Sequence, residues 1–479
     1  MYNLDNILKK VKIETIIGST NKQIVNICFD SRKVSKNYLF VAQKGTLVDG
    51  HIFIDKSIEN GACVIVCEEL PKNIQDNVTY IKVKSSDKAL GIISSNFYNN
   101  PSSKLKLIGI TGTNGKTTTV TLLHNLFTNF GIKTGLISTI VNKINNEEIS
   151  AIHTTPDAIE INRLLSLMVE AQCQYVFMEV SSHAIIQQRI VGLKFFGGIF
   201  SNLTHDHLDY HKTFEAYRDA KKLFFDNLPS TAFCLVNIDD KNGLVMQQNT
   251  RATRYTYSLR QLADFYAKII ENTIDGLIMN FNNIEVCTRL IGKFNAYNLL
   301  AIYATASLCG IENEQIMLGI SMLESVNGRF NIFTLKNGAK AIVDYAHTPD
   351  ALQNVLSTLT EISRNAKIIS VIGCGGNRDK TKRPQMSAIA QKFSNLIIIT
   401  SDNPRYENPE DIIADMLKGF NRLDNVLTIL ERASAIKTAC TIATKGDIVL
   451  IAGKGHETYQ EINGIKHHFD DKEEILKYC

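Results

Sequence analysis

A short glycine-rich turn between two apolar segments constrains the fold of this chain more than any other feature. Residues 107–110 are apolar throughout, which is typical of a buried strand, and residues 117–130 carry apolar side chains at helical spacing. Between them, Gly112 and Gly115 let the backbone approach a ligand, and Lys116 adds a positive charge. Because backbone N–H groups at a helix N-terminus attract anions, this strand–loop–helix unit predicts a phosphate site.

The loop differs from the usual nucleotide-binding pattern, which requires glycine at position 110, where this chain has isoleucine. It is therefore a shortened variant, and this difference points away from generic P-loop ATPases. Thr117 follows the lysine, where a hydroxyl ligand to Mg²⁺ is expected. The residues that we expect to hold nucleotide phosphates are Gly112, Thr113, Asn114, Gly115, Lys116, Thr117 and Thr118.

The remaining sequence alternates between strand and helix patterns, and its 479 residues are too many for one core. We predict three α/β domains: a smaller N-terminal domain at 1–100, a central P-loop domain with a mostly parallel sheet at 101–327, and a C-terminal Rossmann-like domain at 328–479. The polar stretch 99–104 is interpreted as the first linker. In such sheets ligands bind at the carboxyl ends of the strands.

Composition excludes several classes of protein. The net charge of +4 gives no support for nucleic-acid binding, and no apolar run approaches the length of a membrane span. The ten cysteines show no C-x-x-C pair, and residues 1–12 contain no export signal, so we expect reduced thiols and a cytoplasmic location. We also expect a monomer that acts on small molecules.

Two residues of the central block, Glu179 and His207, are candidates for metal chemistry. Glu179 ends an apolar run, where a carboxylate can hold Mg²⁺, although a solvated or capping glutamate is an equally good interpretation. His207 lies in a stretch with three histidines and two aspartates, typical of either a metal site or a surface loop. Lys221, on the following helical segment, is interpreted from its position alone as a solvated lysine.

Four charged segments of the third block follow predicted strands, at residues 344–350, 374–383, 402–405 and 453–457. Their common position at one sheet edge favours a binding site over solvated loops. Arg378 in the basic segment has the planar fork that suits a carboxylate or phosphate. Nucleotide in one domain and a charged metabolite in another suit ATP-driven joining of a carboxylate to an amine through an acyl phosphate.

An ordered series of motifs across nearly the whole chain resembles the Mur ligase family, the ATP-dependent amino-acid ligases of peptidoglycan synthesis. The motifs are Phe29-Asp-Ser-Arg32, Thr111-Gly-Thr-Asn-Gly-Lys-Thr-Thr118, Glu179-Val-Ser-Ser-His183, Asp206-His-Leu-Asp-Tyr-His211, Gly292-Lys-Phe-Asn-Ala-Tyr-Asn298, Gly328-Arg-Phe330, Asp344-Tyr-Ala-His347, Asp402-Asn-Pro-Arg405 and Gly453-Lys-Gly-His-Glu457. Each motif is weak or moderate alone, whereas their order is highly specific.

This resemblance implies an ATP- and Mg²⁺-dependent ligase and assigns roles to individual residues. Lys116, His207 and Lys221, the last as a carbamate, would serve catalysis, and Thr117, Glu179, His207 and Lys221 would bind the metal. Asn295, Arg329 and Asp344 would contact ATP. The UDP-N-acetylmuramoyl dipeptide would meet Ser31, His153, Thr154, Thr155, Ser181, Gln187 and Arg189. The incoming amino acid would meet Arg378, Asp402, Asn403, Pro404, Arg405, Gly453 and Glu457.

The segment 402–405 resembles the form found in ligases that add meso-diaminopimelate rather than L-lysine. Diaminopimelate ends in a second carboxylate that Arg405 can bind with paired hydrogen bonds, whereas L-lysine would leave a buried arginine unpaired. The alternatives are an L-lysine-adding ligase, a folylpolyglutamate synthetase, and a P-loop switch or transport ATPase. Folate enzymes share the phosphate loop but lack the first domain and this segment.

Overall fold

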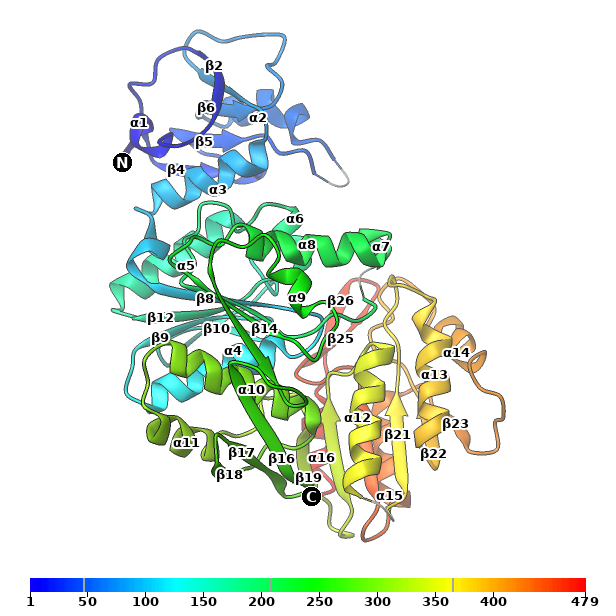
Figure 1. Cartoon of the computed structure of the whole chain (residues 1–479). Helices are drawn as coiled ribbons and strands as arrows, with labels where there is room; N and C mark the ends of the chain where they lie inside the picture. The colour runs from blue at the N-terminus through cyan, green and yellow to red at the C-terminus, as the bar shows by residue number, and fades with distance from the viewer. Residues whose placement is uncertain (46–47, 207, 364–365) are drawn as a thin grey trace.

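Three α/β domains follow one another along the chain, each built around its own sheet (Figure 1). The structure is a computed structural model that describes residues 1–45, 48–206, 208–363 and 366–479. The N-terminal domain is at the top of the view and the C-terminal domain at the lower right, both against the central domain. The predicted three-domain fold class is therefore confirmed, while the exact boundaries after residues 100 and 327 stay predictions.

The N-terminal domain contains a five-stranded sheet in the order β2-β7-β6-β5-β4. Its elements are β1 (Tyr2–Asn3), α1 (Leu4–Ile7), β2 (Ile13–Ile17), β3 (Gln23–Ile24), β4 (Asn26–Cys28), η1 (Ser31–Lys33), β5 (Tyr38–Val41), η2 (Gly50–Phe53), α2 (Ile54–Glu59), β6 (Ala62–Cys67), β7 (Thr79–Val83) and α3 (Ser86–Phe97). Alternate residues of β6 pack into two cores, Val64 and Val66 on the side of α3 and Ile65 on the side of α2. Both faces are buried, which explains why the whole strand is apolar.

The central domain is an eleven-stranded sheet in which β8 lies between β12 and β13. Its elements are η3 (Pro101–Lys104), β8 (Lys106–Thr111), α4 (Lys116–Asn129), β9 (Thr134–Ile137), β10 (Val141–Ile144), β11 (Glu147–Ser150), α5 (Ala158–Glu170), β12 (Tyr175–Glu179), α6 (Ser182–Ile186), β13 (Gly197–Phe200), α7 (Leu208–His211), α8 (Phe214–Asp226), β14 (Phe233–Asn237), α9 (Gly243–Met246), β15 (Thr253–Ser258), β16 (Phe265–Thr273), β17 (Gly276–Phe281), β18 (Ile284–Thr288), α10 (Lys293–Leu308) and α11 (Asn313–Ser321). Ile108 and Ile110 pack against α4 and α10, and Leu107 packs against α5 and α8. Strands β9, β12, β8, β13, β14, β15 and β16 are parallel, as the β/α alternation predicts.

Two features of this domain were not predicted. Antiparallel strands close both edges of the sheet, β10 and β11 at one end and β17 and β18 at the other. The predicted linker at 99–104 is largely an ordered 3₁₀ turn, because Pro101 and Ser102 are buried and the Ser102 hydroxyl accepts a hydrogen bond from the Lys194 amide. Tertiary packing therefore fixes a segment that its polar composition suggested would be a loose connection.

The C-terminal domain is a six-stranded sheet in the order β19-β20-β24-β21-β22-β23, with an additional hairpin of β25 and β26. Its elements are β19 (Asn331–Thr334), β20 (Lys340–Asp344), α12 (Pro349–Ile362), β21 (Ile368–Ile372), α13 (Lys382–Phe393), β22 (Leu396–Ile399), α14 (Pro409–Leu417), β23 (Val426–Thr428), α15 (Arg432–Ile442), β24 (Ile448–Ala452), β25 (Tyr459–Ile462), β26 (Ile465–His468) and α16 (Asp471–Leu476). Ile368 and Ile372 pack towards α12 and α13, and Ile369 and Val371 towards α15. The loops after β20, β21, β22 and β24 consequently meet at one edge, as predicted.

Two whole-chain expectations can be compared with the structure. All ten cysteines are free, so no disulfide ties the domains together. In the part of the chain that the structure describes, no helix is both long and apolar enough to cross a bilayer.

Candidate functional site

The phosphate loop connects β8 to α4 in a conformation that only glycine supports at two points. Gly115 caps α4 with φ +86°, and a Cβ there would lie 2.5 Å from the Asn298 side-chain oxygen. A Cβ on Gly112 would overlap the Ser201 hydroxyl. The Thr113 amide donates a hydrogen bond to the Asn202 carbonyl at 2.9 Å, so the neighbouring loop supports the phosphate loop. Both glycines are thus required by close packing as well as by ligand approach.

Two lysines meet at the carbonyl oxygen of Gly112. Lys116 Nζ donates to this oxygen at 2.9 Å, and Lys221 Nζ donates to it at 2.8 Å. Burial lowers the pKa of Lys116 and lowers that of Lys221 well below its ordinary value. Lys221 is only 1% exposed and its Nζ lies 4.6 Å from the centre of the Tyr217 ring. The interpretation of Lys221 as a solvated lysine was therefore wrong, because α8 turns this side chain towards the phosphate loop.

Glu179 ends β12 beside this loop and is fully buried. Its Oε1 accepts a hydrogen bond from the Thr139 amide at 2.7 Å, whereas Oε2 has no hydrogen-bond partner among the described residues. A buried carboxylate oxygen that accepts no hydrogen bond destabilises the folded protein unless a cation lies next to it. The geometry at Glu179 therefore fits the predicted metal ligand.

The rest of the predicted metal site is only partly described. Thr117 is buried at the start of α4, with its hydroxyl 3.4 Å from Arg329 Nη2. His207, predicted as a catalytic and metal-binding residue, lies outside the described residues. Within the described ranges no three His, Cys, Asp or Glu side chains form a metal-binding group. The predicted set relies instead on Glu179 together with Thr117, Lys221 and His207.

Four of the residues predicted to hold the dipeptide form a connected group next to Glu179: Thr155, Ser181, Gln187 and Arg189. Thr155 Oγ1 donates to the Glu179 carbonyl at 2.8 Å and accepts a hydrogen bond from the Ser181 amide. Arg189 donates to the Thr155 carbonyl at 2.7 Å and to Gln187 Oε1 at 2.6 Å. The group is therefore positioned by the same strand end that presents the candidate metal ligand.

The predicted amino-acid side of the site is assembled from three loops of the C-terminal domain. Asn403 Nδ2 donates to Glu457 Oε2 at 2.7 Å, which links the loop after β22 to the loop after β24. Arg405 Nη1 donates to the Gly376 carbonyl at 2.8 Å, which links it to the loop after β21. A Cβ on Gly453 would lie 2.6 Å from Asp402 Oδ2, so glycine is needed for this close approach.

Arg329 connects the C-terminal domain to the phosphate loop. Besides its contact with Thr117, its guanidinium lies 4.7 Å from the centre of the Tyr345 ring. Asp344 Oδ2 accepts a hydrogen bond from the Phe330 amide at 2.8 Å, and burial raises the Asp344 pKa to about 6. Asn295 bonds to Asn298, the neighbour of Gly115. Two of the three residues predicted to contact ATP, Asn295 and Asp344, thus do not line the cavity but hydrogen-bond to residues next to its wall.

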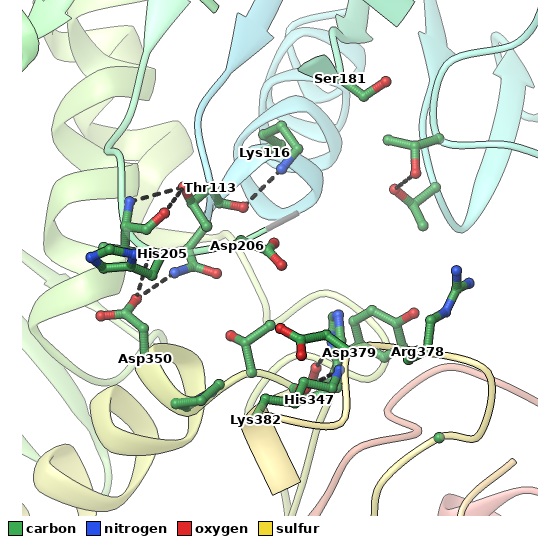
Figure 2. Close-up of a pocket in the computed structure, with 18 of the residues that line it drawn as sticks. Thr113, Lys116, Ser181, His205, Asp206, His347, Asp350, Arg378, Asp379 and Lys382 are labelled. Carbon is green, nitrogen blue, oxygen red and sulfur yellow. Dashed lines mark hydrogen bonds between the residues drawn. The ribbon is translucent and has the colours of Figure 1, made fainter. Parts of the chain in front are cut away.

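One cavity of about 1260 Å³ connects these groups across the central and C-terminal domains. Figure 2 shows Lys116, Ser181 and Asp206 on the central-domain side, facing Arg378 and Lys382 on the opposite side. The predicted residues that line it are Thr113, Asn114, Gly115, Lys116, Thr117, Thr118, His153, Thr154, Thr155, Glu179, Ser181, Arg189, Lys221, Arg329, Arg378, Asp402, Asn403, Arg405, Gly453 and Glu457. Those described but not on its wall are Ser31, Gly112, Gln187, Asn295, Asp344 and Pro404. Ser31 lies apart, in η1 of the N-terminal domain.

Sequence reasoning assigned no role to several further residues of this cavity, among them His347, Asp350, Asp379 and Lys382 (Figure 2). All four lie inside or beside segments that were singled out as charged loops. Asp350 is the most informative of them, because its side chain contacts the phosphate loop of the other domain. No local pattern distinguishes an aspartate with this contact from one that caps its own helix.

A phosphate loop that faces charged loops of a doubly wound domain across one cavity defines a class of enzyme, the nucleotide-dependent ligases. Comparison with known proteins gives the family. The Mur ligase middle domain matches residues 110–306, the Mur ligase glutamate ligase domain matches 328–455, and the Mur ligase family catalytic domain matches 23–98. The chain belongs to the Mur ligase family.

Two relatives and one solved structure that are similar to this chain over nearly its whole length carry the same name. A UDP-N-acetylmuramoyl-L-alanyl-D-glutamate–2,6-diaminopimelate ligase of Cytophaga hutchinsonii is 56% identical over 98% of this chain and 97% of its own. The protein of the same name from Bacteroides fragilis is 54% identical over 99% and 98%. A solved structure under this name is 31% identical, covers 100% of this chain and 98% of its own, and has a TM-score of 0.72.

Proposed function

We propose that this enzyme joins meso-2,6-diaminopimelate to the D-glutamate of UDP-N-acetylmuramoyl-L-alanyl-D-glutamate and cleaves ATP in doing so. The names of similar proteins support this reaction, and so does the arrangement of the cavity. ATP would bind at the phosphate loop, and the dipeptide would lie near Thr155 and Arg189. The N-terminal domain, with Ser31, would hold the uridine end of the nucleotide sugar.

One observation carries the choice of amino acid. Arg405 lies on the cavity wall opposite the phosphate loop, held by the Gly376 carbonyl and within 3.5 Å of Glu461. Its side chain is only 21% exposed. A carboxylate at the far end of diaminopimelate would pair with this guanidinium, whereas L-lysine would place an ammonium group there and repel it. Arg378, on the same wall, would bind a second carboxylate.

The reaction follows from the chemistry of a carboxylate. An oxygen of the D-glutamate carboxylate attacks the γ-phosphorus of ATP, the bond to ADP breaks, and an acyl phosphate forms. The diaminopimelate amine then attacks the acyl carbon, phosphate leaves, and the nitrogen loses one proton. Lys116 would stabilise the negative charge around the transferred phosphoryl group, and closure of the C-terminal domain over the cavity would keep water from the acyl phosphate.

We infer that Thr117, Glu179, His207 and a carbamylated Lys221 hold Mg²⁺. When bound, the ion would neutralise phosphate charge and orient the reacting oxygens. The lowered pKa of Lys221 favours the neutral amine, which can attack CO₂ and lose a proton to give a carbamate. The partnerless Oε2 of Glu179 supports a cation at this position.

Substitution of Lys221 tests the carbamate. We expect Lys221→Ala to lower the rate of amide formation by about 10- to 100-fold, by loss of a group that orients the metal. Short carboxylates such as acetate should restore part of this activity. Carbon-13 NMR of enzyme supplied with labelled CO₂ should show one carbamate signal that Lys221→Ala lacks. An absent signal together with no rescue would refute the assignment.

The function itself is tested by measuring phosphate release and amide formation in parallel. The enzyme is supplied with ATP, Mg²⁺ and the nucleotide dipeptide, and then with either meso-diaminopimelate or L-lysine. We expect diaminopimelate to give one amide per phosphate and L-lysine to give little product. Equal use of L-lysine would favour the alternative amino acid, and phosphate release without any amide would favour an ATPase of another class.

A further inference from the structure

One carboxylate oxygen of the C-terminal domain connects three segments of the protein. Asp350, at the second position of α12, accepts at Oδ2 a hydrogen bond from Asn114 Nδ2 at 2.7 Å. The same oxygen accepts from the Thr204 hydroxyl at 3.1 Å and from Asn354 Nδ2 at 3.2 Å. Asn114 belongs to the phosphate loop, Thr204 to the loop after β13, and Asn354 to α12 itself. Two of these three bonds therefore cross from the C-terminal to the central domain (Figure 2).

The two central-domain partners of Asp350 are already tied to each other. The Asn114 amide donates to Asn202 Oδ1 at 2.9 Å, and its carbonyl accepts from the Ser201 hydroxyl at 2.7 Å. The Thr204 amide donates to Thr113 Oγ1 at 3.0 Å. The phosphate loop and residues 201–204 are consequently held together as one hydrogen-bonded unit. Asp350 bonds to both of these segments, so its contacts depend on the position of the whole phosphate loop and not on that of one flexible side chain.

The contacts of Asp350 with Asn114 and Thr204 form only when the C-terminal domain lies against the phosphate loop, which we call the closed arrangement. Its side chain is partly buried in the cavity wall, and burial raises its pKa. If the C-terminal domain moved away, the carboxylate would be solvated and its bonds to Asn114 and Thr204 would be lost. Charge-assisted hydrogen bonds of this kind are about twice as strong as neutral ones. The bond to Asn354 would persist, because both residues belong to α12.

We propose that Asp350 is a positioning residue that holds the C-terminal domain closed over the phosphate loop during the reaction. It acts through its hydrogen bonds to Asn114 and Thr204. This inference rests on the proposed function: closure by Asp350 keeps water away from the acyl phosphate until the amine attacks. Without the contact, the acyl carbon remains open to hydrolysis, so phosphate is released without an amide.

The test compares three variants in the assay that measures both products. We expect Asp350→Ala to raise the ratio of phosphate to amide several-fold above one. Asp350→Asn, which keeps one acceptor oxygen, should return the ratio towards one. Asn354→Ala is the matched control: it removes a partner of the same oxygen within α12 and should leave the ratio at one. Thermal unfolding of all three variants monitors stability separately.

Small-angle X-ray scattering tests the domain arrangement without any turnover. A non-hydrolysable ATP analogue and the nucleotide dipeptide should reduce the radius of gyration of the wild type and of Asn354→Ala. In Asp350→Ala the ratio of closed to open molecules should fall on the order of 100-fold, since two hydrogen bonds to a charged group are lost. The reduction in radius should therefore be small or absent in this variant.

Each outcome decides the proposal. A ratio that stays at one in Asp350→Ala, with a normal decrease in radius, would overturn it. An equal loss of phosphate release and amide formation, accompanied only by lower stability, would also overturn it, because that result indicates a structural role. If the wild type formed no amide, the proposed function would fail. Scattering alone would then decide whether Asp350 holds the domains together.

Discussion

At the scale of single residues, burial changes the chemistry of groups that would be ordinary on a surface. Lys116 and Lys221 share the Gly112 carbonyl, and each loses part of its tendency to hold a proton. Asp344 shows the opposite effect, because burial favours the neutral acid. These shifts come from the position of the side chains in the fold.

Asp344 gives a prediction about pH. Its carboxyl has a pKa of about 6 in the folded protein against an ordinary value of 3.8, so the folded state keeps a proton that the unfolded chain releases. The burial of Asp344 therefore costs little stability below pH 3.8 and costs increasingly more as the pH rises to 6. We expect the stability of Asp344→Asn relative to the wild type to increase by about 2 kcal/mol between pH 4 and pH 7. Urea unfolding at both pH values measures this gain, and a pH-independent difference would contradict it.

Arg405 gives a prediction about specificity. We expect Arg405→Ala to raise the KM for diaminopimelate by about 100-fold, since a paired charge-assisted contact is lost, and to change the KM for ATP less than about threefold. Arg422→Ala is a control, because that arginine is 68% exposed and lies 3.6 Å from Asp424 on the surface. Steady-state kinetics with each substrate varied separately would distinguish these effects. An equal rise in both KM values would contradict the role of Arg405.

At the scale of elements, the strand that leads to the phosphate loop packs too tightly for any larger residue. A Cβ on Gly109 of β8 would lie 2.7 Å from the Phe224 ring and 2.9 Å from both Phe195 and Val180. The helix α8 that carries Phe224 also carries Lys221. The close contact of β8 with α8 thus determines how far Lys221 reaches towards Gly112.

Gly109→Ala should therefore disturb both stability and the site. We expect a loss of about 1–3 kcal/mol, because the added methyl group displaces the Phe224 ring. Gly310→Asn is a control: a Cβ there meets nothing within 4 Å, and asparagine tolerates its positive φ. Thermal unfolding measures both variants. An unchanged melting temperature for Gly109→Ala would show that α8 can shift without cost.

At the scale of the whole molecule, three domains have separate cores, and two of them, the central and the C-terminal domain, share one cavity. The phosphate loop belongs to the central domain, while Arg329 and Asp350 reach it from the C-terminal domain. The core of the N-terminal domain, by contrast, contributes no residue to the described wall of this cavity. We therefore expect nucleotide binding to stabilise the central and C-terminal domains and not the N-terminal domain.

Calorimetry tests this coupling. A non-hydrolysable ATP analogue at 100 times its Kd should stabilise the domains that contact it by about 2.7 kcal/mol. We expect the unfolding transition of the central domain to move to higher temperature, and that of the N-terminal domain to remain unchanged. Lys116→Ala should weaken binding of the analogue and so reduce the shift in unfolding temperature of the central domain. An equal shift of every transition would show that the three domains unfold as one unit.

The sequence by itself determined the parts of this protein that depend on local pattern. The apolar run that Glu179 ends is the strand β12, and the predicted helix at 117–130 lies within one residue of α4 at each end. The phosphate loop and the four charged loops were predicted because periodicity and glycine spacing are local properties. The ordered motifs also indicated the family, because each motif is a short local pattern that can be recognised in the sequence.

Only the tertiary structure decided how distant segments meet. Lys221 has the sequence signature of a solvated helix residue, yet it is buried against Gly112. Asp350 has that of a helix-terminal carboxylate, yet it binds Asn114 of another domain. Burial and contact of this kind depend on packing between segments far apart in the chain, which no local pattern encodes. The sequence therefore indicates which residues belong to the site, whereas packing determines their protonation states and their hydrogen-bond partners.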